Sequence, residues 1–188
     1  MKVKMFFCVL MFMFVVAGCA GVQQGGSGGD SKSSKGWSND DLKDMGSIIW
    51  AETVKAIRRM NPETTLETLI PDFQGVTRNI DRIIEVAPEV VSHNMETVKR
   101  LTREVRIQAK YERSLEVLRY LKAQGINRTK SGIMLGLGET EAEVIQTLED
   151  LRSVGLDIVT LGQYLQPSKK HLSVKEFITP EQFKKYEE

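Results

Sequence analysis

Residues 131–161 read SGIMLGLGETEAEVIQTLEDLRSVGLDIVTL, a stretch that predicts a strand, a helical crossover and a second strand. The apolar run at 131–135 predicts the first strand, and a glycine-rich turn follows it. Thr140 and Glu143 then form a capping box, in which the threonine hydroxyl accepts from a backbone N–H and the glutamate reaches back. Apolar residues at helical spacing follow, and a last strand is predicted at 156–161. Two parallel strands joined by a crossover helix are therefore predicted.

Upstream, two further strands alternate with helices. The strands are predicted at 66–70 and 90–94. The apolar positions at helical spacing are Ile48, Ile49, Val54, Ile57 and Met60, then Ile80, Ile83, Ile84 and Ala87, then Leu115, Leu118 and Leu121. A final helix is predicted with Pro180 as its first residue. Four strands with crossovers predict an α/β fold, either a partial parallel barrel or an open sheet, because a closed barrel needs about eight strands.

The N-terminal segment has a different composition. Two lysines within residues 1–4 precede an apolar run over 5–17, which is shorter than the ~18–20 residues of a membrane span. Small residues then lead into Cys19, a pattern that resembles the lipobox of bacterial lipoproteins. Residues 1–19 are therefore predicted to be a lipoprotein-like signal peptide with Cys19 as the lipidation site. The alternatives are an uncleaved anchor or a buried apolar helix.

Residues 20–36 are rich in glycine and serine and predict a flexible linker. Residues 37–188 are enough for one domain with its own core. The 26 lysines and arginines against 25 acidic residues give a net charge of +1, which does not indicate nucleic-acid binding. Membrane contact is expected only through lipidated Cys19. Cys8 lies inside the removed segment, so no disulfide is predicted.

Lipidation gives a first testable prediction. A Cys19→Ala variant is expected to lose incorporation of radiolabelled palmitate, because the acylated thiol is gone. The measurement is labelling of the full chain in a bacterial host. A Cys8→Ala variant, altered inside the signal, is the matched control and should keep its label. Equal labelling of the two variants would contradict the predicted site.

Polar and glycine residues follow the predicted strands at their carboxyl ends, where parallel α/β sheets bind ligands. Each such turn taken singly is an ordinary strand-to-helix loop, but four on one rim favour a shared pocket. Gly136 and Gly138 allow a ligand to approach the backbone closely, just before a helix N-terminus that favours anionic groups.

Five segments, in the same order, closely resemble lipoyl synthase. They are residues 69–75 (LIPDFQG), 92–98 (SHNMETV), 111–115 (YERSL), 130–139 (KSGIMLGLGE) and 162–168 (GQYLQPS). The resemblance begins near Asp40 and covers roughly the second half of that family's length. It implies an α/β fold of the radical SAM type: a partial parallel (β/α) barrel of about four strands with crossover helices, lacking the first strands.

The resemblance also implies a reaction. Lipoyl synthases insert two sulfur atoms, at C6 and C8, into an octanoyl chain attached to a lysine of a lipoyl carrier domain. One 4Fe–4S cluster cleaves S-adenosylmethionine to a 5′-deoxyadenosyl radical, and a second cluster is consumed as the sulfur source. The octanoylated carrier domain is the implied partner, and the cytoplasm is the compartment in which the family works.

The resemblance assigns a set of residues to S-adenosylmethionine binding. They are Asn94, Glu96, Arg113, Lys130, Gly132, Gly136, Glu139 and Gln163. Asn94 and Glu96 match positions near the ribose and methionine groups, and residues 132–139 match the adenine-side motif. Without the resemblance, Arg113 reads as a surface helix charge and Lys130 as a solvated residue at a strand start. No catalytic side chain is assigned.

The chain has no cysteine after Cys19. A 4Fe–4S cluster is typically held by three or four thiolates, so no metal ligand is assigned in this chain. We therefore expect a truncated lipoyl synthase derivative that is inactive alone, and that self-associates through the sheet edge at 66–70. The alternative is a lipid-anchored envelope protein with a remnant half-barrel that binds S-adenosylmethionine or a carrier protein. The location is the cell envelope if the signal is used and the cytoplasm if the family's behaviour prevails.

Two histidine-containing segments are open to a binding interpretation. Lys169, Lys170 and His171 follow the last strand, where they either dock an acidic carrier domain or form a solvated loop. His93 is expected to make hydrogen bonds at its strand end and not to bind metal.

Overall fold

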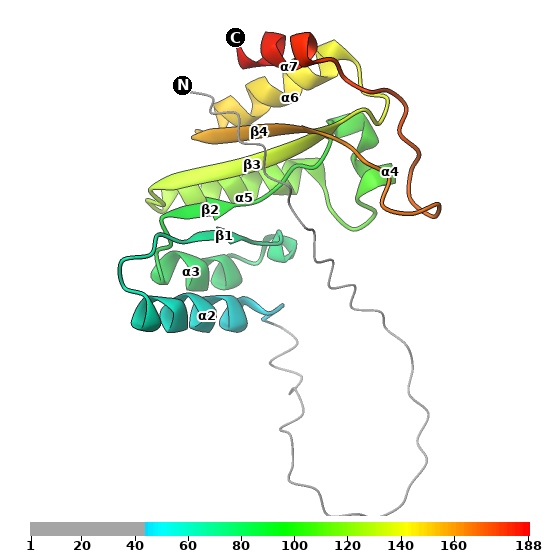
Figure 1. Ribbon diagram of the computed structural model, residues 1–188. Coiled ribbons are helices and arrows are strands. Elements are labelled where there is room, and N and C mark those ends of the chain that lie inside the picture. The colour runs from blue at the N-terminus through cyan, green and yellow to red at the C-terminus, as the bar shows by residue number, and fades with distance from the viewer. Residues whose placement is uncertain (1–43) are drawn as a thin grey trace, which may run out of the picture.

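The computed structural model describes residues 44–188, in which four parallel strands form one curved sheet (Figure 1). The strands are β1 (Glu67–Leu69), β2 (Val90–Ser92), β3 (Arg128–Leu135) and β4 (Ile158–Gln163), and they are neighbours in that order. Crossover helices join the strands, as the α/β prediction of a partial parallel barrel requires, and that prediction is confirmed. The predicted signal peptide, linker and lipidation site lie outside the described residues.

The predicted helices are all present, and the structure adds several short ones. The α-helices are α2 (Ser47–Met60), α3 (Thr77–Glu85), α4 (Thr102–Val105), α5 (Tyr111–Ala123), α6 (Glu141–Ser153) and α7 (Pro180–Glu187), and the 3₁₀ turns are η1 (Phe73–Gly75) and η2 (Lys99–Leu101). Helix α4 and the two 3₁₀ turns are too short to produce an apolar period, so no sequence pattern predicts them. Among the described helices, none has the length and apolar character to cross a membrane.

Local chemistry fixes where the helices begin. The Thr140 hydroxyl accepts from the Glu143 N–H at the start of α6, and the Glu143 carboxylate accepts from the Thr140 N–H, so the predicted capping box is confirmed. Thr179 caps α7, whose first residue is Pro180, as predicted. Each cap satisfies backbone donors that the helix itself leaves unpaired, and is typically worth about 1 kcal/mol.

The predicted start of the last strand was wrong. Strand β4 begins at Ile158, later than the expected position 156. Asp157 is anchored instead, because its carboxylate accepts from the Thr129 N–H at 2.8 Å and from the Lys122 ammonium at 2.7 Å. These contacts hold Asp157 in the turn after α6, so β4 begins only at the next residue, Ile158.

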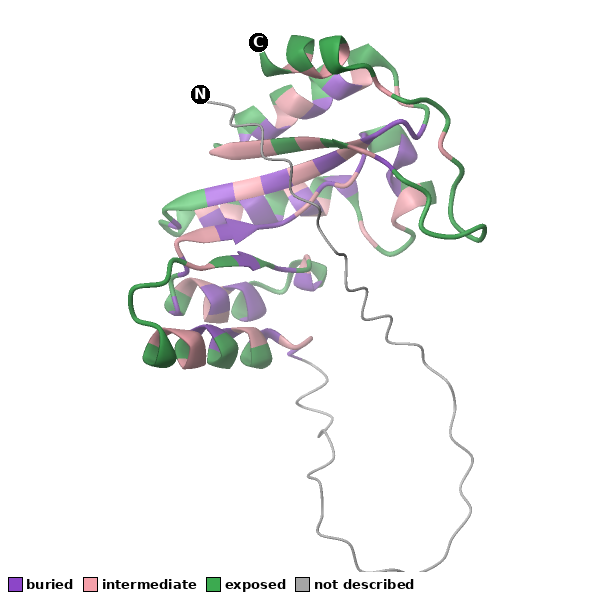
Figure 2. Ribbon diagram, viewed as in Figure 1, coloured by how far each residue is buried: buried purple, intermediate pink, exposed green. Residues whose placement is uncertain are grey.

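The sheet has one covered and one open face. Along β3, Thr129, Ser131, Ile133 and Leu135 are buried, whereas the residues between them are only half-buried (Figure 2). Leu118 and Leu121 of α5 are fully buried on the covered side, where each contributes about 1.5–3 kcal/mol through burial. The open face carries polar side chains, among them Ser92, Lys130 and Thr160.

Candidate functional site

The open face carries small and polar side chains at matching register. Gly132 of β3 pairs with Thr160 of β4, and Lys130 pairs with Ser92 of β2. Successive residues of a strand point to opposite faces, so these residues lie on the same side of the sheet. Thr160 and Gly162 of β4 are exposed on this side. Helices pack on the other side, beside and behind the strands (Figure 1).

The chain that follows β2 contains an extra residue opposite β3. His93 N–H donates to the Lys130 carbonyl, but the next ladder bond is made by Glu96 N–H to the Gly132 carbonyl. Three residue steps on one side therefore match two on the other, which is a bulge. Bulges re-aim side chains beside binding sites. Glu96 adopts φ 65°, a left-handed conformation that is uncommon for a residue other than glycine.

The bulge brings Asn94 over the glycine of β3. A Cβ placed on Gly132 would lie 3.0 Å from Asn94 Oδ1 and 3.2 Å from Thr160 Oγ1. Only glycine leaves this space between the two polar side chains. The result is a small cradle, formed by Asn94, Gly132 and Thr160, that offers an amide and a hydroxyl to a ligand.

Glu96 is next to this cradle and carries a perturbed carboxyl group. Burial raises the pKa of Glu96 above its ordinary value, and a hydrogen bond from the Asn94 side chain and the charge of Arg106 partly oppose that shift. A half-buried carboxylate beside an amide is suited to accept hydrogen bonds from ligand hydroxyls.

Lys130 lies on the same face but is paired. Its ammonium is 2.8 Å from Glu67 Oε1, which also accepts from the Ser92 hydroxyl at 2.7 Å. This polar triplet links β1, β2 and β3 below the cradle. The structure therefore brings together four of the predicted residues, namely Asn94, Glu96, Lys130 and Gly132.

Arg113 turns toward the loop that follows β1. Its Nε lies 2.7 Å from Asp72 Oδ2, and its Nη2 donates to the Gln108 carbonyl at 2.8 Å. Both side chains of the ion pair are mostly buried, so the guanidinium is committed to holding η1 against α5.

Gly136, Glu139 and Gln163 form a second cluster at the carboxyl ends of β3 and β4. The Glu139 carboxylate accepts from the N–H groups of Gly136 and Leu137 and so fixes the glycine turn. The Gln163 amide donates to the Glu176 carbonyl at 3.1 Å and accepts from the Ile178 N–H at 2.8 Å. These side chains bind the chain's own backbone, and residues 175–178 pack over the turn.

Sequence reasoning missed Arg106 and Thr160. Arg106 follows the short α4, in a stretch without periodicity, and its Nη1 donates to the Asn94 carbonyl at 2.9 Å. No sequence signal would have found it. Thr160 could have been found from the predicted pairing of the last two strands, because it lies directly opposite Gly132 and its side chain therefore points to the same face of the sheet. His93 makes two buried hydrogen bonds, as predicted.

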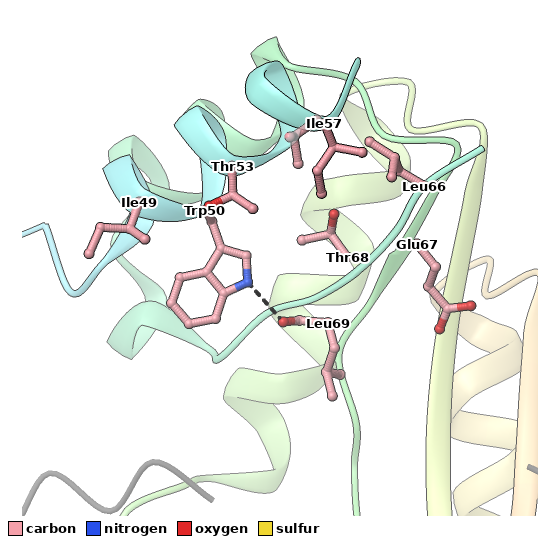
Figure 3. Close-up of a pocket in the computed structure, with 9 residues that line it drawn as sticks. Ile49, Trp50, Thr53, Ile57, Leu66, Glu67, Thr68 and Leu69 are labelled. Carbon is pink, nitrogen blue, oxygen red and sulfur yellow. Dashed lines mark hydrogen bonds between the residues drawn. The ribbon is translucent and has the colours of Figure 1, made fainter. Parts of the chain in front are cut away.

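A groove of about 360 Å³ lies between α2 and the free edge of β1. Its lining is mainly apolar, and the Trp50 indole N–H donates to the Leu69 carbonyl at 3.0 Å (Figure 3). Trp50 thereby satisfies one of the edge acceptors of β1. The groove is separate from the polar cradle on the open face.

The described residues do not fit an iron–sulfur cluster. Across residues 44–188 there is no group of three or more histidine, cysteine, aspartate or glutamate side chains that could hold a metal ion. Cys8 and Cys19 fall in the part of the chain that the structure does not describe.

Comparison with known proteins places these features in a family. Residues 35–151 match the model of the radical SAM superfamily. The chain is 88% identical to a mitochondrial lipoyl synthase of Nematostella vectensis over 148 residues, which are 79% of this chain and 51% of the relative. It is 86% identical to a lipoyl synthase of Christiangramia forsetii over 148 residues, 79% of this chain and 50% of that protein.

A more distant lipoyl synthase, from Bacteroides fragilis, is 57% identical over 149 residues, 79% of this chain and 51% of the relative. The chain spans about half the length of the curated relatives it matches. The matched superfamily region contains most of the residues of the open face and its bulge. By its sequence and its parallel sheet, the chain belongs to the radical SAM superfamily.

Proposed function

We propose that residues 40–188 are the S-adenosylmethionine-binding part of a lipoyl synthase, which inserts sulfur at C6 and C8 of a protein-bound octanoyl chain. The observation that carries this proposal is the 88% identity over 148 residues with a lipoyl synthase. The partner that the proposal implies is an octanoylated lipoyl carrier domain.

The cradle suits the sugar of an adenosine. The Asn94 amide and the Thr160 hydroxyl can each donate and accept a hydrogen bond, and the Glu96 carboxylate accepts, which matches the hydroxyls of a ribose. Gly132 leaves the space that the sugar would fill. When bound, S-adenosylmethionine would supply the 5′-deoxyadenosyl group, and the one electron needed for its reductive cleavage would come from a 4Fe–4S cluster held outside residues 44–188. The chain's own residues hold and orient the ligand.

The proposal gives residues 44–188 a binding role. This stretch contains no cysteine, and a 4Fe–4S cluster is typically held by three or four thiolates. Those thiolates must therefore come from outside these residues, and we expect no turnover from them alone. The Lys130 ammonium lies on the same face as the cradle, where it is paired with Glu67, and it is a candidate partner for a ligand carboxylate.

Isothermal titration with S-adenosylhomocysteine tests the proposal, since this ligand carries the same adenosine and needs no turnover. The full chain is expected to bind it, and Gly132→Val is expected to weaken binding by about 10-fold to 100-fold, equivalent to 1–3 kcal/mol of overpacking in the cradle. The valine also crowds Asn94 and Thr160 in the free protein, so the melting temperature should fall, and affinities are compared on variant protein that is still folded at the titration temperature.

Gly162→Ala is the matched control. A Cβ at Gly162 meets no atom within 4 Å, although the residue lies on the same face. Its affinity should stay within about 3-fold of the unaltered chain, a difference well under 1.4 kcal/mol. The proposal fails if the unaltered chain gives no binding heat, and the cradle is the wrong site if Gly132→Val binds equally well.

A further inference from the structure

Arg106 is the one arginine whose guanidinium reaches the backbone of the bulge. Its Nη1 donates to the Asn94 carbonyl at 2.9 Å and to the Met95 carbonyl at 3.4 Å. The residue follows α4 directly and is largely removed from solvent, and burial lowers its pKa from the ordinary value. Two successive carbonyls are thus held by one cationic donor, and charged hydrogen bonds of this kind are stronger than neutral ones.

The same guanidinium starts a chain of hydrogen bonds whose direction is fixed by chemistry. His93 Nδ1 is 3.0 Å from the Ile70 carbonyl, which can only accept, so this nitrogen carries the proton. His93 Nε2 must then accept, and the Ser114 hydroxyl, 2.9 Å away, donates to it. Ser114 Oγ in turn accepts from Arg106 Nη1 at 3.3 Å. The directions from Arg106 through Ser114 and His93 to Ile70 are consistent, and the two N–H groups of Arg106 Nη1 are shared among three acceptors, the Asn94 carbonyl, the Met95 carbonyl and Ser114 Oγ.

The relay ties the bulge to two rigid elements. Ile70 ends the β1 segment, and its N–H donates to the Ser92 carbonyl, while Ser114 is fully buried in the first turn of α5. Arg106 therefore connects the loop after β2 to the frame of the sheet and to a helix. A residue with φ 65°, as at Glu96, keeps that conformation only if its surroundings enforce it.

Electrostatics points the same way. The Arg106 charge is the main cation facing Glu96, and it opposes the rise that burial imposes on the pKa of that carboxyl. Arg113, which only the family resemblance assigned to the site, is held by Asp72. Arg106, and not Arg113, is therefore the cation that acts on the Glu96 carboxyl beside the cradle.

We propose that Arg106 is a positioning residue that, through the Asn94 and Met95 carbonyls and the Ser114–His93 relay, sets Asn94 and Glu96 for the ribose of the bound adenosine. This inference rests on the proposed function. Arg106 itself contacts the backbone and does not touch the ligand. Its effect is on the geometry of the two side chains that do.

The test compares Arg106→Gln and Arg106→Lys in the full chain, with S-adenosylhomocysteine and its 2′-deoxy analogue as probes. Arg106→Gln is expected to weaken binding of S-adenosylhomocysteine at least 10-fold, in line with the cost of losing charged hydrogen bonds. Its preference for ribose over 2′-deoxyribose should fall toward 1. Arg106→Lys keeps a cationic donor and should recover most of the affinity.

Arg103→Gln is the matched control, because Arg103 lies in α4 just before Arg106, is exposed, and makes no hydrogen bond or ion pair found among the described residues. Its affinity and sugar preference should match the unaltered chain. The inference would be overturned if only a fraction of the Arg106→Gln protein bound ligand while that fraction kept the affinity and sugar preference of the unaltered chain. That result would indicate that Arg106 serves folding alone. Absence of binding by the unaltered chain would instead reject the proposed function, and the inference with it.

Hydrogen exchange gives a measurement that needs no ligand. The Glu96 amide donates to the Gly132 carbonyl, and the Met95 amide donates to Ser131 Oγ at 3.1 Å. Both amides should exchange faster in Arg106→Gln, while amides in the middle of α6 keep their protection. Unchanged exchange at both positions would overturn the inference.

Discussion

A Gly136→Ala variant is expected to lose about 3 kcal/mol or more of unfolding free energy. Gly136 has φ 101°, and a Cβ there would collide with the Gln163 amide nitrogen and with the Glu176 backbone carbonyl. The left-handed conformation alone costs an L-residue about 1–2 kcal/mol. Overpacking adds about 1–3 kcal/mol, because a backbone carbonyl cannot rotate away as a side chain can. The measurement is urea unfolding of the full chain.

The collision would also release the segment that crosses the turn. Lys175 N–H donates to the Gly136 carbonyl at 2.8 Å, and Gln163 Oε1 accepts from the Ile178 N–H. Moving Glu176 disturbs both bonds. We therefore expect residues 175–178 to become the first site of limited proteolysis in the Gly136→Ala variant.

Gly125→Ala separates the two costs. Gly125 has φ 85°, but a Cβ there meets nothing within 4 Å. This variant should lose only the conformational term of about 1–2 kcal/mol. Equal losses for the two glycine variants would contradict the steric argument at Gly136.

The fold could be predicted because its signals are local. Apolar runs and helical periods alternate along the chain, and the capping box at Thr140 and the proline at position 180 mark helix starts that the structure reproduces. The start of β4 was missed because Leu156 continues the apolar run, while the feature that decides the boundary is a long-range contact. The Asp157 carboxylate reaches the backbone of Thr129 on the neighbouring strand.

The site was only partly predictable, for the same reason. Asn94 and Glu96 come from the segment after β2 and meet Gly132, which lies within β3, because the bulge places them beside it. The extra residue of the bulge is invisible in the sequence, since it exists only relative to β3. Arg113 and Arg106 are both arginines near the binding motifs, so residue type alone does not show which of them lies behind Asn94 and Glu96. Only the Asp72 ion pair and the Asn94 carbonyl distinguish them.

Acidification is expected to destabilise the protein through His93. The side chain is 1% exposed, and burial lowers its pKa from 6.5 to about 4, an effect that the Ile70 carbonyl partly opposes and the Arg106 charge reinforces. Between these two values the unfolded chain takes up a proton that the folded chain refuses. Stability is therefore complete above about pH 6.5 and is lost as pH falls toward 4, by on the order of 3 kcal/mol.

The physical cause is the direction of the relay. In protonated His93 the Nε2 atom carries a proton and can no longer accept a hydrogen bond, so the Ser114 hydroxyl loses the acceptor to which it donates. The positive charge of the ring would also be buried near the positive charge of Arg106. Asp72 is the opposing carboxylate nearby, but it is already paired with Arg113. The Ile70 carbonyl and the Asp72 charge favour the imidazolium, but burial outweighs both, which is why the folded state disfavours it.

Urea unfolding at a series of pH values measures this dependence, and the chain provides its own control. The protein has two histidines, His93 and the exposed His171. His93→Gln should be less stable at pH 7 but should show a much flatter slope between pH 6.5 and 4, because nothing is left to titrate at that buried position. His171→Gln should keep the full slope of the unaltered chain. If the curves of the unaltered chain and His93→Gln run parallel through this range, the acid sensitivity arises elsewhere and the relay does not control it.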